Sequence, residues 1–346
     1  MPRLAIGSYT AAYAAFRAVG DGLSLLDFDS TTGSLALRDV LRDLPNPAYL
    51  RPHRGGVLLT VCEAAAGHAA LAWVDVGERL LLRGRLALPG AVPCHVDVDP
   101  TGRLAAVACY ASGDVLLCAL VEDGSPSAVV GATRHEGSSV NPARQAGPHP
   151  HAVRFSPAGG FLIVPDLGTD HVWVHTVRDG ALGDAPWRWK GPAGSGPRLL
   201  LFAPDGRHAL LVLEMASAVC SLRWHDGRLE LAQLASSLRA AHAGANTASG
   251  LRLHPSGRLF AVSNRGADRI ALFSFDPADG AIALVDEVAS GGAKPRDFEF
   301  SPCGRWLIAA NQDGDNLAVF AVEGEKLRDT GIRHALRSPS CVRFVD

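Results

Sequence analysis

The hydrophobic positions of this chain fall in short runs that are separated by polar turns. Segments 161–164 and 306–309 are apolar throughout, and no long stretch shows the spacing of about 3.6 residues expected of an amphipathic helix. Short apolar runs bounded by turn residues are typical of buried strands. The pattern therefore predicts an all-β protein.

One unit recurs along the chain: an apolar strand, a turn of the type Pro-x-Gly, a second apolar strand, a polar loop and a third strand. The turn prolines are Pro52, Pro100, Pro157, Pro204, Pro255 and Pro302, at spacings of 48, 57, 47, 51 and 47 residues. Proline presets the first turn angle, and glycine accepts the positive φ of a tight hairpin. A repeat of about 50 residues with about four strands is typical of a β-propeller blade.

The two ends of the chain supply a seventh unit. Segment 340–346 matches the first strand of a unit, segment 4–9 matches a second strand, and segments 22–28 and 33–37 fit a third and a fourth. The sequence thus predicts a seven-bladed β-propeller in a single domain, residues 1–346, whose last blade is closed by both N- and C-terminal strands. We expect an N-terminus used in this way to be retained.

Two rings of variable residues are expected at one mouth of the central channel. The first two strands of a blade form a hairpin, so the start of the first and the end of the second lie at the same end. Counting six residues back from each turn proline gives Asn46, Cys94, His151, Arg198, Ser249 and Arg296, with Ser340 from the shared blade. Counting ten forward, or eleven in the first unit, gives Glu63, Tyr110, Leu167, Glu214, Arg265 and Gln312, with Tyr9. Variation confined to one end of a repeating scaffold indicates a functional site.

The residue types in these rings suit an anionic substrate. Three arginines can bind phosphate or carboxylate oxygens bidentately. Either Glu214 or His151 can deprotonate a water, and an arginine beside a carbonyl can stabilise an oxyanion. The alternative is that these charges only pair with one another along a water-filled channel.

Metal binding and cysteine chemistry are the other interpretations of single features. His149 and His151 share a strand face, but a third zinc ligand at suitable spacing is missing. Segment 166–170 has too few oxygen ligands for calcium. We therefore expect no metal and no cofactor. Cys94 is interpreted as a space-filling residue rather than a nucleophile.

Composition excludes several classes of partner. Lysine and arginine together number 33 against 35 aspartates and glutamates, so neither nucleic acid nor a membrane surface is expected as a partner. No apolar run approaches the ~20 residues of a membrane span. The seven cysteines are an odd number without a C-x-x-C pair, and no export signal is visible, which favours a reducing cytoplasm. We expect a monomer or a weak homo-oligomer.

Several short motifs carry a resemblance to a known family. They lie at 7–10, 93–96, 149–152, 165–170, 196–198, 214, 263–266, 295–296 and 310–312. In this order they resemble the seven-bladed lactonase family, which includes the propeller-type 6-phosphogluconolactonases and the fungal carboxy-muconate cyclases. The resemblance implies a cytoplasmic enzyme that opens or closes a lactone ring on an anionic substrate without a metal. By analogy with the cyclases, it implies catalytic roles for His151, Arg198, Glu214 and Arg265.

We therefore hypothesise a lactone hydrolase that acts on a small anionic lactone, 6-phosphoglucono-δ-lactone. Glu214, assisted by His151, activates the water, while Arg198, Arg265 and Arg296 hold the phosphate or polarise the carbonyl. The remaining substrate-binding residues in this hypothesis are Glu63, Asn46, Tyr110 and Gln312. Two alternatives stay open: a cycloisomerase that lactonises a muconate-type diacid, and a propeller that serves only as a binding platform for proteins.

Overall fold

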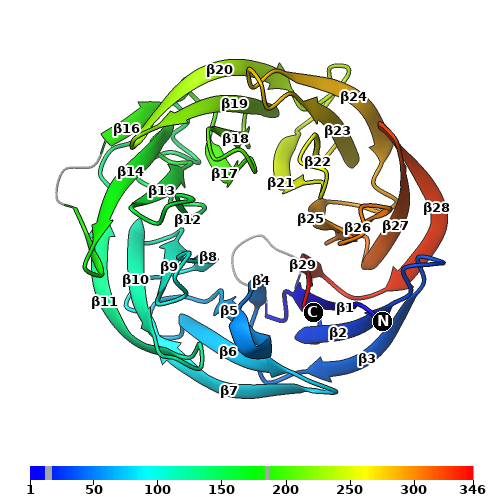
Figure 1. Cartoon of the computed structure of the whole chain (residues 1–346), viewed down its shortest axis with the longest axis horizontal. Coiled ribbons are helices and arrows are strands. Elements are labelled where there is room, and N and C mark those ends of the chain that lie inside the picture. The colour runs from blue at the N-terminus through cyan, green and yellow to red at the C-terminus, as the bar shows by residue number, and fades with distance from the viewer. Residues whose placement is uncertain (12–17, 184–186, 346) are drawn as a thin grey trace.

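Seven small sheets are arranged around a central axis, like the blades of a propeller (Figure 1). The computed structural model describes residues 1–11, 18–183 and 187–345. Over these residues each sheet is antiparallel, and its first strand in blade order lies nearest the axis (Figure 1). The prediction of an all-β, seven-bladed propeller is confirmed.

The first three blades each place their strands in chain order from the axis outward. Blade 1 comprises β4 (Pro47–Pro52), β5 (Val57–Cys62), β6 (Ala70–Val76) and β7 (Leu80–Ala87), with the 3₁₀ turn η1 (Arg54–Gly56). Blade 2 comprises β8 (Pro93–Val98), β9 (Leu104–Cys109), β10 (Asp114–Leu120) and β11 (Pro126–Arg134). Blade 3 comprises β12 (Arg154–Phe155), β13 (Phe161–Asp166), β14 (His171–Arg178), and β15 (Ala181–Leu182) and β16 (Trp187–Lys190), which both pair with β14.

The other four blades each contain four strands. Blade 4 comprises β17 (Pro197–Phe202), β18 (His208–Leu213), β19 (Ala218–His225) and β20 (Arg228–Ser236). Blade 5 comprises β21 (Thr247–Leu253), β22 (Leu259–Arg265), β23 (Arg269–Phe275) and β24 (Ile282–Ala289). Blade 6 comprises β25 (Pro295–Phe300), β26 (Trp306–Asn311), β27 (Asn316–Glu323) and β28 (Lys326–Ala335). Blade 7 comprises β29 (Pro339–Phe344), β1 (Arg3–Ser8), β2 (Leu23–Phe28) and β3 (Leu35–Leu41).

Blade 7 joins the two ends of the chain. Strand β29 pairs with β1 in antiparallel register, with Leu4 opposite Phe344 and Ile6 opposite Val342. The N and C labels lie close together on this blade (Figure 1). The predicted closure of the last blade by both terminal strands is confirmed.

The hairpin turns between the first and second strands follow the predicted chemistry. Gly102 and Gly257 have φ of +69° and +67°, a conformation that glycine adopts without the steric penalty of a side chain. Blade 1 differs, because η1 replaces the short turn and β4 runs as far as Pro52 itself. The turn proline of this blade therefore lies closer to the strand than in the other blades.

The core is divided among the spaces between neighbouring blades. One cluster joins Val61 and Leu71 of blade 1 to Val96 and Val107 of blade 2, and all four side chains are fully buried. Equivalent clusters fill the spaces between all the remaining pairs of adjacent blades. Each sheet is therefore apolar on both faces, which explains the fully apolar strands in the sequence.

Two further features concern the described residues. All seven cysteines are free thiols, and only Cys303 is exposed. In the part of the chain that the structure describes, no helix is long and apolar enough to cross a membrane.

Candidate active site

A bulge at the mouth end of the innermost strands aims the first ring of residues into the channel. The pairing register shifts between Pro93 and His95, between Pro197 and Leu199, and between Pro295 and Asp297. A bulge leaves one residue unpaired and re-aims its side chain. Cys94, Arg198 and Arg296 are the unpaired residues, and Ser249 and Ser340 occupy equivalent shifts in blades 5 and 7.

The structure corrects the first-ring residue of blade 1, which is Ala48 rather than Asn46. The register of β4 shifts between Pro47 and Tyr49, and Ala48 lines the hollow at the mouth. Counting six residues back from Pro52 gave Asn46. Strand β4 ends at Pro52 itself, whereas in blade 2 the strand ends two residues before the turn proline, so the count in blade 1 is two residues too long. The proline directly before the ring residue, as in Pro47-Ala48 and Pro93-Cys94, is the sequence signal that identifies the position.

Asn46 supports the site through the backbone. Its Oδ1 accepts hydrogen bonds from the N–H groups of Thr10 and Ala11, at 2.7 and 2.9 Å, and its Nδ2 donates to the carbonyl of Glu63 at 3.0 Å. Its φ of +42° is one that asparagine tolerates better than most residues. Asn46 thus fixes the backbone beside Tyr9 and Glu63.

The second ring lies where the sequence analysis expected it, at the end of each second strand. The backbone N–H of Glu63 donates to the carbonyl of Asn46, and that of Glu214 donates to the carbonyl of Gly196. In other blades, the equivalent N–H donates in the same way to a backbone carbonyl just before the first-ring residue. These N–H groups belong to Tyr9, Tyr110, Leu167 and Gln312. Both rings therefore meet at one mouth of the channel.

Glu214 is the centre of a cluster of cations. Its Oε2 lies 2.7 Å from Arg198 Nε and 3.0 Å from Arg265 Nη2, and its Oε1 lies 2.9 Å from Arg144 Nη2. His151 Nε2 is 3.8 Å away. Burial alone would raise the pKa of this carboxyl, but the surrounding cations, Arg265 foremost, hold that pKa well below its usual range. Glu214 is therefore ionised at neutral pH.

His151 is buried against the same cluster. It is 9% exposed, and its Nδ1 lies 4.0 Å from Cys94 Sγ. Burial lowers the pKa of His151 well below its usual range, and Arg198 adds to this effect while Glu214 opposes it. The imidazole is therefore neutral at pH 7, with one ring nitrogen free to accept a proton.

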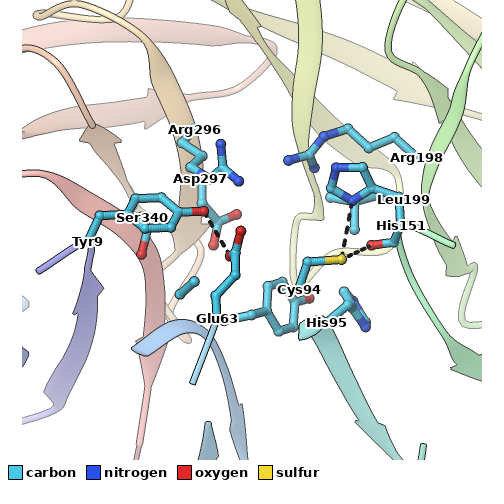
Figure 2. Close-up of a pocket in the computed structure, with 12 residues that line it drawn as sticks. Tyr9, Glu63, Cys94, His95, His151, Arg198, Leu199, Arg296, Asp297 and Ser340 are labelled. Carbon is cyan, nitrogen blue, oxygen red and sulfur yellow. Dashed lines mark hydrogen bonds between the residues drawn. The ribbon is translucent and has the colours of Figure 1, made fainter. Parts of the chain in front are cut away.

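The opposite wall of the hollow contains Tyr9, Glu63 and Arg296 (Figure 2). The hydroxyl of Tyr9 donates to Glu63 Oε2 at 2.9 Å. The guanidinium of Arg296 lies over the Tyr9 ring, 5.0 Å from its centroid, and within 3.5 Å of Gln312 Oε1. Burial raises the pKa of Glu63, against the opposing effects of Arg296 and Tyr9. The pKa values of the two glutamates of the mouth are thus shifted in opposite directions.

Arg144 is a site residue that was not predicted from the sequence, and His149 was considered there only as a zinc ligand. Arg144 lies in the loop between β11 and β12, and reaches both Glu214 and the Tyr110 hydroxyl, the latter at 3.4 Å. His149 stacks on the Tyr110 ring with centroids 4.5 Å apart. The signal for this loop is the spacing of 57 residues between Pro100 and Pro157, the longest in the repeat.

A second tier of charged residues fills the channel below the site. Its members lie three residues after the first ring in most blades: Arg51, Asp97, Arg154, Arg252, Glu299 and Arg343. Arg252 and Arg343 both contact Asp297, at 2.7 and 2.8 Å, while Arg51 and Arg154 contact Asp97, each at 3.1 Å. The same alignment of repeats that gave the rings could have found this tier. These charges pair with one another beneath the mouth.

The enclosed space between the two walls has a volume of about 20 Å³. Tyr9, Glu63, Cys94, His151, Arg198, Arg296 and Ser340 line it at the mouth, with His95, Leu199 and Asp297 also contributing (Figure 2). Among the described residues, no cluster of three or more histidines, cysteines and acids has the geometry of a metal site. His149 Nδ1 instead lies 2.8 Å from the carbonyl oxygen of Tyr110.

Fold and mouth together define a seven-bladed propeller with a buried, arginine-rich cluster at one mouth. The family model described as "Lactonase, 7-bladed beta-propeller" matches residues 3–344, and the chain belongs to this family.

Individual relatives resemble the chain over nearly its whole length. A 6-phosphogluconolactonase of Bacillus subtilis is 29% identical over 98% of this chain and 97% of its own. A solved structure from Bacteroides fragilis has a TM-score of 0.91 and 28% identity, and covers 100% of this chain and 98% of its own. The periplasmic gluconolactonase of Pseudomonas aeruginosa has a TM-score of 0.89 and 30% identity, and covers 100% and 99%. These relatives support a lactone hydrolase.

Proposed function

We propose that this protein hydrolyses the ring of a phosphorylated sugar lactone, with 6-phosphoglucono-δ-lactone as its substrate. The charge balance of the mouth carries the proposal, because Arg144, Arg198 and Arg265 share the single carboxylate of Glu214. The excess positive charge suits an anionic ligand, since guanidinium groups bind phosphate and carboxylate oxygens bidentately. The relatives named 6-phosphogluconolactonase and gluconolactonase support a lactone ring as the other part of the substrate.

In this proposal the arginines divide their work between the two ends of the substrate. Arg198 and Arg296 line the hollow and donate hydrogen bonds to the lactone carbonyl oxygen, which becomes negatively charged when water adds. Arg144 and Arg265 contact Glu214 from the β11–β12 loop and from the end of β22, and they bind the phosphate. Glu214 orients Arg144, Arg198 and Arg265.

His151 is the general base of the proposed reaction. A neutral, buried imidazole accepts the proton of the attacking water, whereas the Glu214 carboxylate is already engaged by three guanidinium groups. From the sequence alone, Glu214 was expected to activate the water with His151 assisting. The contacts favour the reverse division, with Glu214 as a positioning residue.

The proposal is tested by measuring hydrolysis of freshly prepared 6-phosphoglucono-δ-lactone above its spontaneous rate. We expect rapid turnover by the wild-type protein and a loss of roughly 10²–10³-fold in Arg198→Ala, since Arg198 acts as an oxyanion donor. Arg228→Ala, on the exposed start of β20, is the matched control and keeps full activity. A wild-type rate equal to the spontaneous rate overturns the proposal. Turnover of a muconate-type diacid without incorporation of water would then identify a cycloisomerase.

A further inference from the structure

We propose that Glu63 is a second catalytic residue, the general acid that protonates the ring oxygen as the lactone opens, and that Tyr9 positions it. This inference rests on the proposed lactonase function. Opening a sugar lactone expels an alkoxide, which is a poor leaving group at neutral pH. A carboxylic acid placed beside the ring oxygen removes this obstacle by donating a proton as the bond breaks.

The placement of Glu63 is the first observation in favour. It follows β5 at the mouth, it is 3% exposed, and it lines the same hollow as His151 and Arg198. Figure 2 shows its carboxyl group on the side of the hollow opposite His151. A substrate bound between the two walls has the base on one side and Glu63 on the other.

The backbone and the side chain of Glu63 are both fixed. Asn46 bonds its N–H and its carbonyl, as described above, while the Tyr9 hydroxyl holds Oε2. Tyr9 is itself fully buried and lies beneath the guanidinium of Arg296. A catalytic acid needs such restraint, because the proton must be presented at hydrogen-bond distance in one direction.

The contrast between the two glutamates of the mouth is the second observation. Three guanidinium groups contact Glu214, whereas the hydrogen bond to Glu63 comes from a neutral phenol. The charged and titratable groups that face Glu63 are Tyr9, Arg296, Arg198 and Cys94. Burial outweighs the two arginines and raises the pKa of Glu63, whereas the cations around Glu214 lower the pKa of that carboxyl. Carboxyls whose environments separate their pKa values are typical acid–base assignments in enzymes.

The step balances without a further reactant. Water adds to the carbonyl carbon and gives one proton to His151, which forms the tetrahedral intermediate. The bond between that carbon and the ring oxygen then breaks, and its electron pair stays on the ring oxygen. Glu63 donates its proton to this oxygen, so the product leaves as a hydroxy acid. The proton on His151 returns through solvent to the Glu63 carboxylate.

Glu63→Gln is the central test, because glutamine keeps the shape and the Tyr9 contact but cannot donate a catalytic proton. We expect kcat for 6-phosphoglucono-δ-lactone to fall by roughly 10²–10⁴-fold, with inhibition by the open acid 6-phosphogluconate unchanged. Glu230→Gln, an exposed carboxyl-to-amide change on β20, serves as the control and keeps wild-type kcat. Thermal unfolding verifies that both variants are folded.

The pH profile separates a catalytic role from a structural one. The wild-type rate should fall at low pH as His151 is protonated and at high pH as Glu63 loses its proton. The Tyr9 hydrogen bond lowers the pKa of Glu63, so Tyr9→Phe should move the high-pH limb upward. Unchanged kcat in Glu63→Gln, or a fall in kcat matched by an equal loss of 6-phosphogluconate binding, overturns the inference while the lactonase function stands. A wild-type protein without lactonase activity overturns both.

Discussion

A carboxylate that accepts from three guanidinium groups is a poor proton acceptor, and this decides the chemistry of Glu214. Its oxygens are within 3.0 Å of Arg144, Arg198 and Arg265, and its pKa lies well below the usual range. Glu214 instead fixes the orientation of the three guanidinium groups. His151, a buried neutral imidazole, retains the ability to accept a proton.

Two variants distinguish these roles. We expect His151→Asn to lower kcat by roughly 10²–10⁴-fold and to abolish the low-pH limb of the rate profile. Glu214→Gln should retain that limb but move it to lower pH, because the Glu214 carboxylate raises the pKa of His151. The measurement is kcat against pH for each variant. A low-pH limb that persists in His151→Asn but disappears in Glu214→Gln would assign the base to Glu214.

A second group of buried histidines lies in and beside blade 3, behind the mouth. His135 Nδ1 lies 2.7 Å from Asp166 Oδ2, and His135 Nε2 lies 3.1 Å from His175 Nε2. His175 Nδ1 is buried and has no hydrogen-bond partner among the residues that the structure describes. Burial, and then His135, lowers the pKa of His175 to about 3. The folded protein therefore keeps His175 neutral where an unfolded chain would protonate it.

This difference predicts how stability changes with pH. Below the unfolded-state pKa of about 6.5, the unfolded chain binds a proton at His175 that the folded protein does not, so the free energy of unfolding decreases as pH falls toward about 3. The contribution over this window is roughly 3–5 kcal/mol. His175→Phe should show a smaller decrease, measured by urea unfolding at several pH values. Equal slopes for the two proteins would contradict the prediction.

At the scale of elements, the β11–β12 loop adds a cation, Arg144, that the repeating blade structure does not provide. It connects blades 2 and 3, and its Gln145 donates to the Leu167 carbonyl and to Asp170 at 2.9 and 2.8 Å. These contacts hold Arg144 over the mouth, where its side chain is 40% exposed. A partly exposed cation at the opening suits the charged end of a substrate.

Arg144→Ala should therefore change substrate preference more than catalysis. We expect KM for 6-phosphoglucono-δ-lactone to rise by roughly 10–100-fold, the value of one charge-assisted hydrogen bond. The KM for unphosphorylated glucono-δ-lactone should change little. Steady-state kinetics with both lactones provide the measurement, and an equal effect on the two would remove Arg144 from phosphate binding.

The elements that could be predicted correctly from the sequence are those whose burial pattern and turn residues recur from blade to blade. Every blade buries aliphatic residues on both faces, and blades 1 to 6 have a glycine with positive φ in the turn between their first two strands. The blades and the closure at β1 and β29 could therefore be predicted. Ala48 was missed because one turn has a different length. Arg144 was missed because the path of a long loop depends on contacts such as that of Gln145 with Asp170, which leave no periodic signal.

At the scale of the whole molecule, the charge on the axis differs in sign from the charge of the chain. The protein carries a formal net charge of −2. Along the channel, arginines outnumber carboxylates both in the site around Glu214 and in the tier around Asp97 and Asp297. A positive cleft in an otherwise negative protein concentrates anions at its mouth.

This field predicts a salt dependence that differs between substrates. The kcat/KM for 6-phosphoglucono-δ-lactone should fall roughly tenfold or more as ionic strength rises from about 0.01 to 1 M, because the screening length shortens from about 30 to 3 Å. The kcat/KM for the neutral glucono-δ-lactone should stay nearly constant. The same assay at several salt concentrations measures both, and parallel curves would argue against steering by the channel.

The shared blade also determines when the protein becomes active during synthesis. Strand β1 is synthesised before blades 1 to 6 and its partner β29 after them, so the ring cannot close until β29 has emerged from the ribosome. Tyr9 and Ser340, which line the hollow, lie on that late seam. A nascent chain that has folded blades 1 to 6 still lacks the part of the pocket wall that Tyr9 and Ser340 form. Catalysis should therefore be the last property to appear, after most of the sheet structure has formed.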